Sequence, residues 1–429
     1  MSRPVAYINA RLVDPASGYD GPGAVLVTNG VIADVAHAPS FGSLSADIEV
    51  VDAEGALLIP GLIDIRVKTG EPGAEPKETL KSAALAAAAG GVTTIVVQPD
   101  TLPVMDEPSV VDFILRRARD IELVKVYPAG AATKGGLGQR MAEIGLMHEA
   151  GCLYVTDADR PIVDSKVLRR VLSYAKAFGV PVAHRPADPW LSAGAVASEG
   201  EFSARMGLPS VPAIAERIML ERDLALVELT GAPFIVDQIT TAAAMDTLRR
   251  GLDRGLPVTA TTSINHLSFN EIDIGDYRTF CKIDPPLRSE DDRQAVIEAV
   301  ASGLIQVIVS AHAPAPAEDK RLPYDEAAPG AVGLQTLLPA LLTFYHEGRI
   351  PLIDLIRTVT SAPAKLLGLT SGRLIKGAPA DLVLCDLNAP VVIDADKLLS
   401  KSKNSPFDGR RLQGKVLRTL VDGRTVFAG

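Results

Sequence analysis

A set of polar and charged side chains follows the short apolar segments of this 429-residue sequence. Its members are Asp64, Arg66, Lys68, Asp100, Thr133, Lys134, Asp157, Asp159, His184, Arg185, Asp237, Gln238, His266 and His312. Carboxylates and imidazoles bind divalent metals and act as acids or bases. Guanidinium and ammonium groups have no lone pair to offer a metal. Because Arg66 and Lys68 stand among the acids, the set predicts a polar site held by ion pairs rather than an obvious metal cage.

Eight apolar segments place these side chains. They span residues 59–67, 93–100, 124–130, 152–159, 180–187, 233–240, 257–264 and 305–312. Most are followed by an amphipathic or Ala-rich helical pattern, and β-then-α units in series favour a closed parallel barrel. The sequence therefore predicts an α/β fold with a (β/α)8 TIM-type barrel over residues 59–366. In such barrels functional groups lie at the C-terminal ends of the strands.

The two ends of the chain carry a different pattern. Residues 1–58 alternate apolar and polar positions, with Asn29-Gly30 between two apolar runs as a hairpin signal, and residues 367–429 return to strand patterns. Since an isolated pair of strands is marginally stable, we expect both ends to form one small composite β-sandwich, made of residues 1–58 and 367–429.

Composition excludes several functions. A net charge of −9, without any basic run, argues against nucleic acid as a partner. Three cysteines without CxxC spacing predict neither a disulfide framework nor a zinc knuckle. No apolar run approaches the ~20 residues that span a bilayer. We therefore expect a cytoplasmic protein that does not enter a membrane.

The segment GLIDIRVKTGEPG at residues 61–73 resembles the first-strand motif of the dihydroorotases, a branch of the amidohydrolase superfamily. Further matches lie at residues 86–106, 285–300 and 372–384, in the order of the family and over nearly the whole chain. The resemblance implies an amidohydrolase barrel and a place in pyrimidine biosynthesis. Active members use two divalent metals to hydrolyse dihydroorotate to N-carbamoyl-aspartate.

The resemblance also shows which ligands have changed. The family's metal-ligand positions correspond here to Arg66, Lys68, Asp157 or Asp159, His184, Gln238 and Ala311. Of these, His184 alone clearly keeps the family residue. Ala311 also stands at the position of the family's general base. We therefore expect no bound metal and no catalytic residue by the family's route, because water without a metal keeps a pKa near ~15.7.

The positions that hold the substrate in the family have changed as well. Its arginine, asparagine and histidine ligands for the substrate carboxylate correspond to Gly70, Asp100 and Ala315. A cation is lost and an anion is introduced, so this vestigial pocket should oppose dihydroorotate.

Ion pairs are the expected replacement for the metals. Loss of two dications would leave acidic side chains uncompensated in a partly buried mouth, which is costly. We expect the replacement cluster to consist of Asp64, Arg66, Lys68, Asp157 and Asp159. Asp237 is expected to be ion-paired too, and His184, His266 and His312 to be structural polar residues.

Three functions remain open. The first is a non-catalytic, oligomeric subunit without a cofactor that assembles with aspartate carbamoyltransferase, as inactive dihydroorotase-like chains of the family do. The second is an active dihydroorotase or related cyclic amidohydrolase that binds zinc at a rearranged site. The third is a metal-free enzyme or ligand sensor with another small molecule in the mouth.

Overall fold

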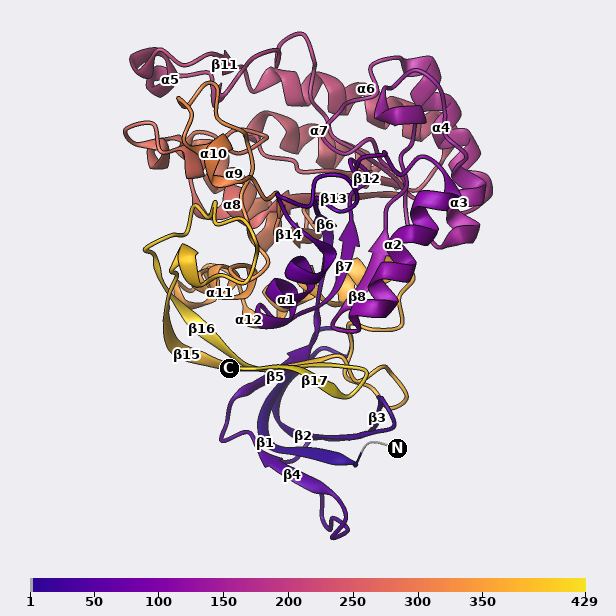
Figure 1. Cartoon of the computed structure of the whole chain (residues 1–429), viewed down its shortest axis with the longest axis vertical. Coiled ribbons are helices and arrows are strands. Elements are labelled where there is room, and N and C mark those ends of the chain that lie inside the picture. The colour runs from indigo at the N-terminus through magenta and orange to yellow at the C-terminus, as the bar shows by residue number, and fades with distance from the viewer. Residues whose placement is uncertain (1–2) are drawn as a thin grey trace.

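In the computed structural model, which describes residues 3–429, the apolar segments line a parallel barrel (Figure 1). Its strands are β6 (Leu62–Val67), β7 (Val92–Val97), β8 (Lys125–Pro128), β9 (Val182–His184), β12 (Phe234–Val236), β13 (Val258–Ser263) and β14 (Val307–Val309). Between β8 and β9, single parallel bridges at Val155 fill the fourth position, and a bridge from Val67 to His312 closes the ring. The predicted (β/α)8 barrel is confirmed.

Helices surround this barrel. The longer ones are α1 (Leu80–Ala89), α2 (Pro108–Ile121), α3 (Ile144–Ala150), α4 (Ser165–Ala177), α6 (Ile214–Thr230), α7 (Ala242–Asp253), α9 (Glu290–Ala301), α11 (Leu337–His346), α12 (Leu352–Val359) and α13 (Ser361–Leu366). Polar side chains cap the N-termini of several of these helices. At α9, for example, the Ser289 hydroxyl accepts the Asp292 N–H at 3.2 Å. Among residues 3–429, no helix is both long and apolar enough to cross a bilayer.

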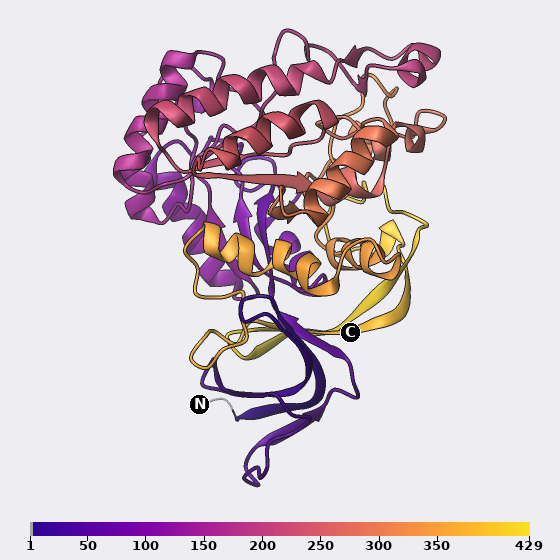
Figure 2. The same ribbon diagram turned by 180° about the vertical axis from the view of Figure 1, so that it is seen from behind.

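Both ends of the chain join in one sheet, seen at the bottom of Figures 1 and 2. Its order is β17-β16-β15-β5-β1-β2-β3, with β4 paired to β1. The strands are β1 (Val5–Asp14), β2 (Tyr19–Thr28), β3 (Val31–Ala36), β4 (Glu49–Asp52), β5 (Leu57–Pro60), β15 (Leu382–Val392), β16 (Arg411–Val421) and β17 (Arg424–Ala428). Buried side chains from both ends, among them Leu12, Val25, Leu382 and Leu420, share one core. The composite module is therefore present, and Asn29-Gly30 forms its β2–β3 turn.

The junction between the module and the barrel differs from the predicted single strand at residues 59–67. The chain divides at Gly61 into β5, which pairs with β15, and β6, which belongs to the barrel. A Cβ at Gly61 would lie 2.2 Å from the Thr93 hydroxyl, so only glycine fits this close approach. The barrel strand therefore begins at Leu62 and carries Asp64, Arg66 and Lys68 to the mouth.

Candidate functional site

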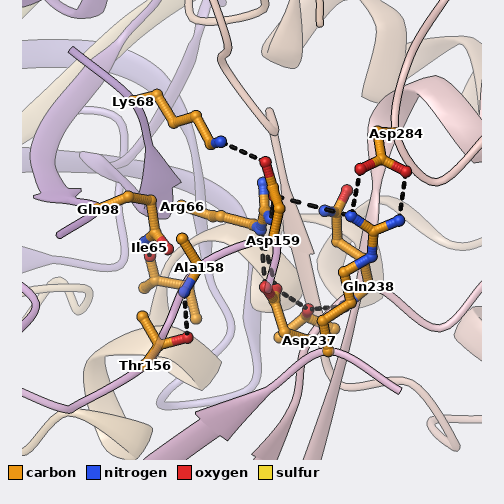
Figure 3. Close-up of polar contacts among 12 residues, drawn as sticks. Ile65, Arg66, Lys68, Gln98, Thr156, Ala158, Asp159, Asp237, Gln238 and Asp284 are labelled. Carbon is orange, nitrogen blue, oxygen red and sulfur yellow. Dashed lines mark hydrogen bonds and ion pairs between the residues drawn. The ribbon is translucent and has the colours of Figure 1, made fainter. Parts of the chain in front are cut away.

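Arg66 lies at the centre of the mouth, near the end of β6, with 3% of its surface exposed. Its Nε donates to Asp237 Oδ2 at 2.8 Å and its Nη2 to Asp159 Oδ1 at 2.6 Å (Figure 3). With its carboxamide oxygen turned toward the guanidinium, Gln238 accepts from Arg66 at 3.1 Å. Burial alone would lower the pKa of Arg66, but the charges of Asp237 and Asp159 raise it. One guanidinium thus joins the ends of the first, fourth and sixth strands.

Lys68 forms the second half of the network. Its Nζ donates to Asp100 Oδ2 at 2.6 Å and also bonds Asp159. Burial opposes the charge of Lys68, yet Asp100 and Asp159 raise its pKa. Burial would likewise raise the pKa of Asp159, but Lys68, Arg66 and Arg185 hold it well below its usual range. Lys68 and Asp159 are therefore both charged at neutral pH.

Arg185, which follows β9, extends the network to a loop that the sequence does not identify as part of the site. Its Nη1 donates to Asp284 Oδ2 at 2.5 Å and lies 3.9 Å from Asp159. Asp284 is 99 positions from Arg185 in the chain and precedes a proline in an irregular segment. No local pattern marks it as a partner, so sequence reasoning missed it.

The structure corrects two members of the predicted ion-pair cluster. Asp64 is fully buried, and its carboxylate accepts backbone N–H groups of Arg66 at 3.2 Å and Ser310 at 3.3 Å. Asp157 accepts the Thr133 N–H at 2.9 Å. In residues 3–429 neither Asp64 nor Asp157 makes an ion pair. Asp64 lies two residues before Arg66 on β6, farther from the mouth. Backbone hydrogen bonds, and not a cation, therefore stabilise its carboxylate.

Burial dominates the titration of these two acids. It raises the pKa of Asp64 to about 6, and it also raises the pKa of Asp157. Asp157 and Asp159 point apart because Ala158 between them has a φ of 53°. Arg66, Lys68 and Asp159 are brought together as predicted, with Asp237 and Asp100 completing the cluster.

His184, the one retained family ligand, already has partners for both ring nitrogens. Its Nε2 accepts the Ile162 N–H at 2.7 Å, and its Nδ1 lies 2.7 Å from Asp223 Oδ2. This arrangement uses the neutral tautomer that donates from Nδ1 to the carboxylate. His184 therefore has no free lone pair directed at the mouth in this conformation.

The other two histidines of the strand ends are also held internally. His266 Nδ1 lies 2.7 Å from Ser263 Oγ and its Nε2 lies 3.1 Å from the Pro285 carbonyl. Burial, with a smaller effect of nearby cations, lowers the pKa of His266 to about 3. His312 Nδ1 accepts the Gly333 N–H at 3.1 Å. Both side chains act as buried polar connectors.

A cavity of about 350 Å³ opens above the network. Gly70 and Asp100, two of the three vestigial pocket positions, line it, whereas Ala315 is buried behind it and donates its N–H to Asn404. A Cβ at Gly70 would lie 1.9 Å from the Ala74 carbonyl oxygen. A side chain at position 70 thus requires the backbone to move.

The side chains at the mouth do not fit the two divalent metals of the amidohydrolases. A catalytic zinc needs three lone-pair ligands. Within residues 3–429 no group of three or more His, Cys, Asp or Glu side chains is arranged to hold a metal ion. The cations of Arg66 and Lys68 lie between the carboxylates, and His184 Nε2 is engaged by Ile162.

The backbone at the mouth is nevertheless strained. Ala158, Gln238 and Ala311 have φ values of 53°, 58° and 50°, a left-handed region that L-residues rarely adopt. Such conformations cost about 1–3 kcal/mol each and cluster at functional sites. The mouth therefore has strained backbone of the kind that is found at functional sites.

Comparison with known sequences identifies relatives along almost the whole chain. A model of dihydro-orotase-like proteins matches residues 55–244, and an amidohydrolase family model matches residues 341–427. The dihydroorotase of Anaeromyxobacter dehalogenans is 40% identical over 97% of this chain and 96% of its own. That of Anaplasma phagocytophilum is 41% identical over 99% and 95%.

Solved structures share the fold. The L-hydantoinase (dihydropyrimidinase) from Arthrobacter aurescens superimposes with a TM-score of 0.86 at 25% identity, over 98% of this chain and 95% of that one. The dihydropyrimidinase from Brevibacillus agri gives a TM-score of 0.85 at 20% identity, over 99% and 95%. Both support the barrel with a terminal β-sandwich.

Proposed function

This chain belongs to the dihydroorotase family of the amidohydrolase superfamily, and we propose that it is a non-hydrolytic member that serves as a structural partner of aspartate carbamoyltransferase. The observation that carries the proposal is the ion-pair network of Arg66, Lys68 and Asp159 at the ligand positions of the family. A guanidinium and an ammonium group there provide charge but no lone pair.

Loss of hydrolysis follows from that chemistry. Metal ions in this superfamily lower the pKa of bound water and polarise the scissile carbonyl. Here the position of the family's general base is Ala311, whose methyl group can take no proton. Asp64 is a buried acid in the same barrel, but backbone N–H groups of Arg66 and Ser310 donate to its two oxygens.

The residues of the pocket predict weak binding of dihydroorotate, which agrees with the same proposal. Asp100 adds a carboxylate where the substrate carboxylate would lie, and like charges repel in a partly closed pocket. The lost arginine cannot return by a simple change, because Gly70 has no room for a side chain.

Assembly is supported by the intact frame and by exposed apolar side chains. Trp190 is 82% exposed, and Ile214, Ile218 and Leu229 are exposed along α6. Of these, tryptophan is a residue type that is enriched at protein interfaces. The partner itself is taken from the inactive members of the family that this chain resembles.

Gel filtration of the chain with the aspartate carbamoyltransferase of the same organism tests the partnership. We expect a new, earlier peak that contains both proteins. Two peaks at the positions of the separate proteins would contradict the proposal.

A double variant tests the chemistry. Arg66→His with Lys68→His restores two imidazoles but leaves Gln238 and Ala311 unchanged. We expect it neither to bind two zinc ions per chain nor to hydrolyse dihydroorotate. If it gained both metal and activity, the account of how catalysis was lost would be wrong. Arg249→His, at an exposed position of α7, controls for added surface histidine.

An active, metal-dependent dihydroorotase is the second candidate. It is favoured by the full-length similarity to proteins named dihydroorotase. Elemental analysis and a dihydroorotase assay on one preparation separate the two. Stoichiometric zinc with turnover would establish the second candidate, and absence of both would support the first.

A further inference from the structure

The carboxylates of the mouth are exposed to the cavity, whereas most of their cationic partners are not. The side chains of Asp100, Asp159 and Asp284 are 40%, 32% and 39% exposed. Those of Arg66 and Arg185 are only 4% and 7% exposed. The arginines thus support the carboxylates from behind, and the charged groups that a ligand meets are three carboxylates with Lys68 and Lys77.

The charges also do not balance inside the mouth. The carboxylates are Asp100, Asp159, Asp237 and Asp284, and the cations are Arg66, Lys68 and Arg185. Among these seven groups the carboxylates outnumber the cations by one, and a fourth cation on the cavity lining, Lys77, brings the numbers of the two signs level. Lys77 lines the same cavity at its exposed rim, where solvent and salt screen its charge. A cleft with low-dielectric walls concentrates ions of the opposite sign.

A second, independent feature is the side chain of Asn265. It is 2% exposed, follows β13 within α8 (Ile264–Ser268) and lines the cavity. Its carbonyl oxygen accepts no hydrogen bond from any residue in the range 3–429. A buried acceptor without a donor is unfavourable, so a ligand with N–H groups would satisfy it.

The shape of the cavity limits the ligand. Its volume of about 350 Å³ is near the lower end for small-molecule sites. Part of its lining is apolar, namely Ile283, Ala313, Pro314, Ala328 and Pro329. The carboxylates and the Asn265 amide are among its polar groups.

We propose that this cavity binds a small organic cation, with a guanidinium, amidinium or primary ammonium head that interacts with Asp100 and Asn265 and a short apolar body that contacts the apolar part of the lining. The proposal adds a ligand to the proposed function and rests on it in one respect, namely that no divalent metals occupy the mouth. Dihydroorotate and N-carbamoyl-aspartate, both anions, are the wrong class for this surface.

Isothermal titration calorimetry on protein dialysed against EDTA tests the proposal. The probes are benzamidine, agmatine and putrescine, with dihydroorotate and N-carbamoyl-L-aspartate as anionic comparisons. We expect at least one cation to bind with a Kd below about 1 mM, more weakly as salt increases, and neither anion to bind. No binding by any of the three cations, or equal binding by an anion, would overturn the proposal.

Variants locate the binding. Asp100→Asn and Asn265→Ala should each weaken the cation by about tenfold or more, since each removes an acceptor. Asp246→Asn, an 88% exposed carboxylate on α7, is the matched control and should leave the affinity unchanged. Asp100 is exposed, so its variant is informative even if Asn265→Ala does not fold. Unchanged binding by Asp100→Asn would place the cation elsewhere and overturn the proposal.

The metal measurement separates this proposal from the previous one. If no cation binds and the protein contains no zinc, the ligand proposal fails and the structural role stands. If two zinc ions are present with turnover of dihydroorotate, both proposals fail.

Discussion

The wall of the barrel and its mouth are stabilised by different interactions. The wall is aliphatic, with Ile63, Val96, Ile235 and Val309 at 0–1% exposure in one cluster. The mouth above it is held by charge pairs around Asp159. Burial of aliphatic side chains is non-directional and independent of the site. Side chains at the mouth can therefore change while the fold stays the same, which fits a chain that keeps the family fold at about 40% identity to dihydroorotases.

The variant with the largest expected effect on stability removes Arg66, the central cation of the mouth. Arg66→Ala leaves the buried Asp237 without its cation and removes one of the cations that pair with Asp159, and breaking a buried ion pair costs about 3–5 kcal/mol. Urea unfolding followed by circular dichroism should show a loss of that size. Arg249→Ala, on the exposed surface of α7, should change the unfolding free energy by less than about 0.5 kcal/mol. Similar values for the two variants would show that the mouth is not held by Arg66.

The second test uses pH and Asp64. Burial raises the pKa of Asp64 to about 6, above its value in the unfolded chain. Between pH 4 and 6 the Asp64 carboxyl is ionised in the unfolded chain but still protonated in the folded protein. The free energy of unfolding therefore decreases as pH rises through this range. The change amounts to about 3 kcal/mol by pH 7.

Asp64→Asn removes that titration. Its unfolding free energy relative to the original protein should rise by about 2–3 kcal/mol between pH 4 and pH 7, whatever the fixed cost of the amide. Urea unfolding across this range measures the difference. A gap between the two proteins that stays constant with pH would show that Asp64 is not held in its neutral form. Acids with a lowered pKa, such as Asp159, have the opposite pH dependence. They stabilise the folded protein above about pH 4, and this stabilisation is lost as pH falls below that value.

The sequence predicts the wall better than the mouth for a physical reason. Periodic apolar runs report local burial, so the predicted segments 93–100 and 257–264 overlap with β7 and β13. The division at Gly61 depends on contact with Thr93, which no local pattern contains. The short fourth position at Val155 likewise has too few backbone bonds to form a regular strand.

At the mouth, the sequence predicts which residues lie at the strand ends, but it does not predict which side chains they pair with. Arg66, Lys68 and Asp159 come from strand ends that a barrel must bring together. Which carboxylate each cation contacts depends on side-chain directions set by single backbone angles, such as the φ of 53° at Ala158. The Asp223 partner of His184 lies 39 positions away on α6, outside any strand-end pattern.

The smallest test compares one alanine of the mouth with one of the wall. Ala311 and Ala183 belong to the same buried cluster, but Ala311 has a φ of 50° whereas Ala183 lies within β9. Ala183→Gly should cost about 1.5 kcal/mol, from a lost methyl contact and added freedom of the unfolded chain. Ala311→Gly loses the same methyl contact and adds the same freedom to the unfolded chain. It also removes the strain of a left-handed alanine, which costs about 1–2 kcal/mol. These effects offset each other, so the unfolding free energy of Ala311→Gly should stay within about 0.5 kcal/mol of the original. Equal losses in the two variants, measured by urea unfolding, would mean that the mouth stores no backbone strain.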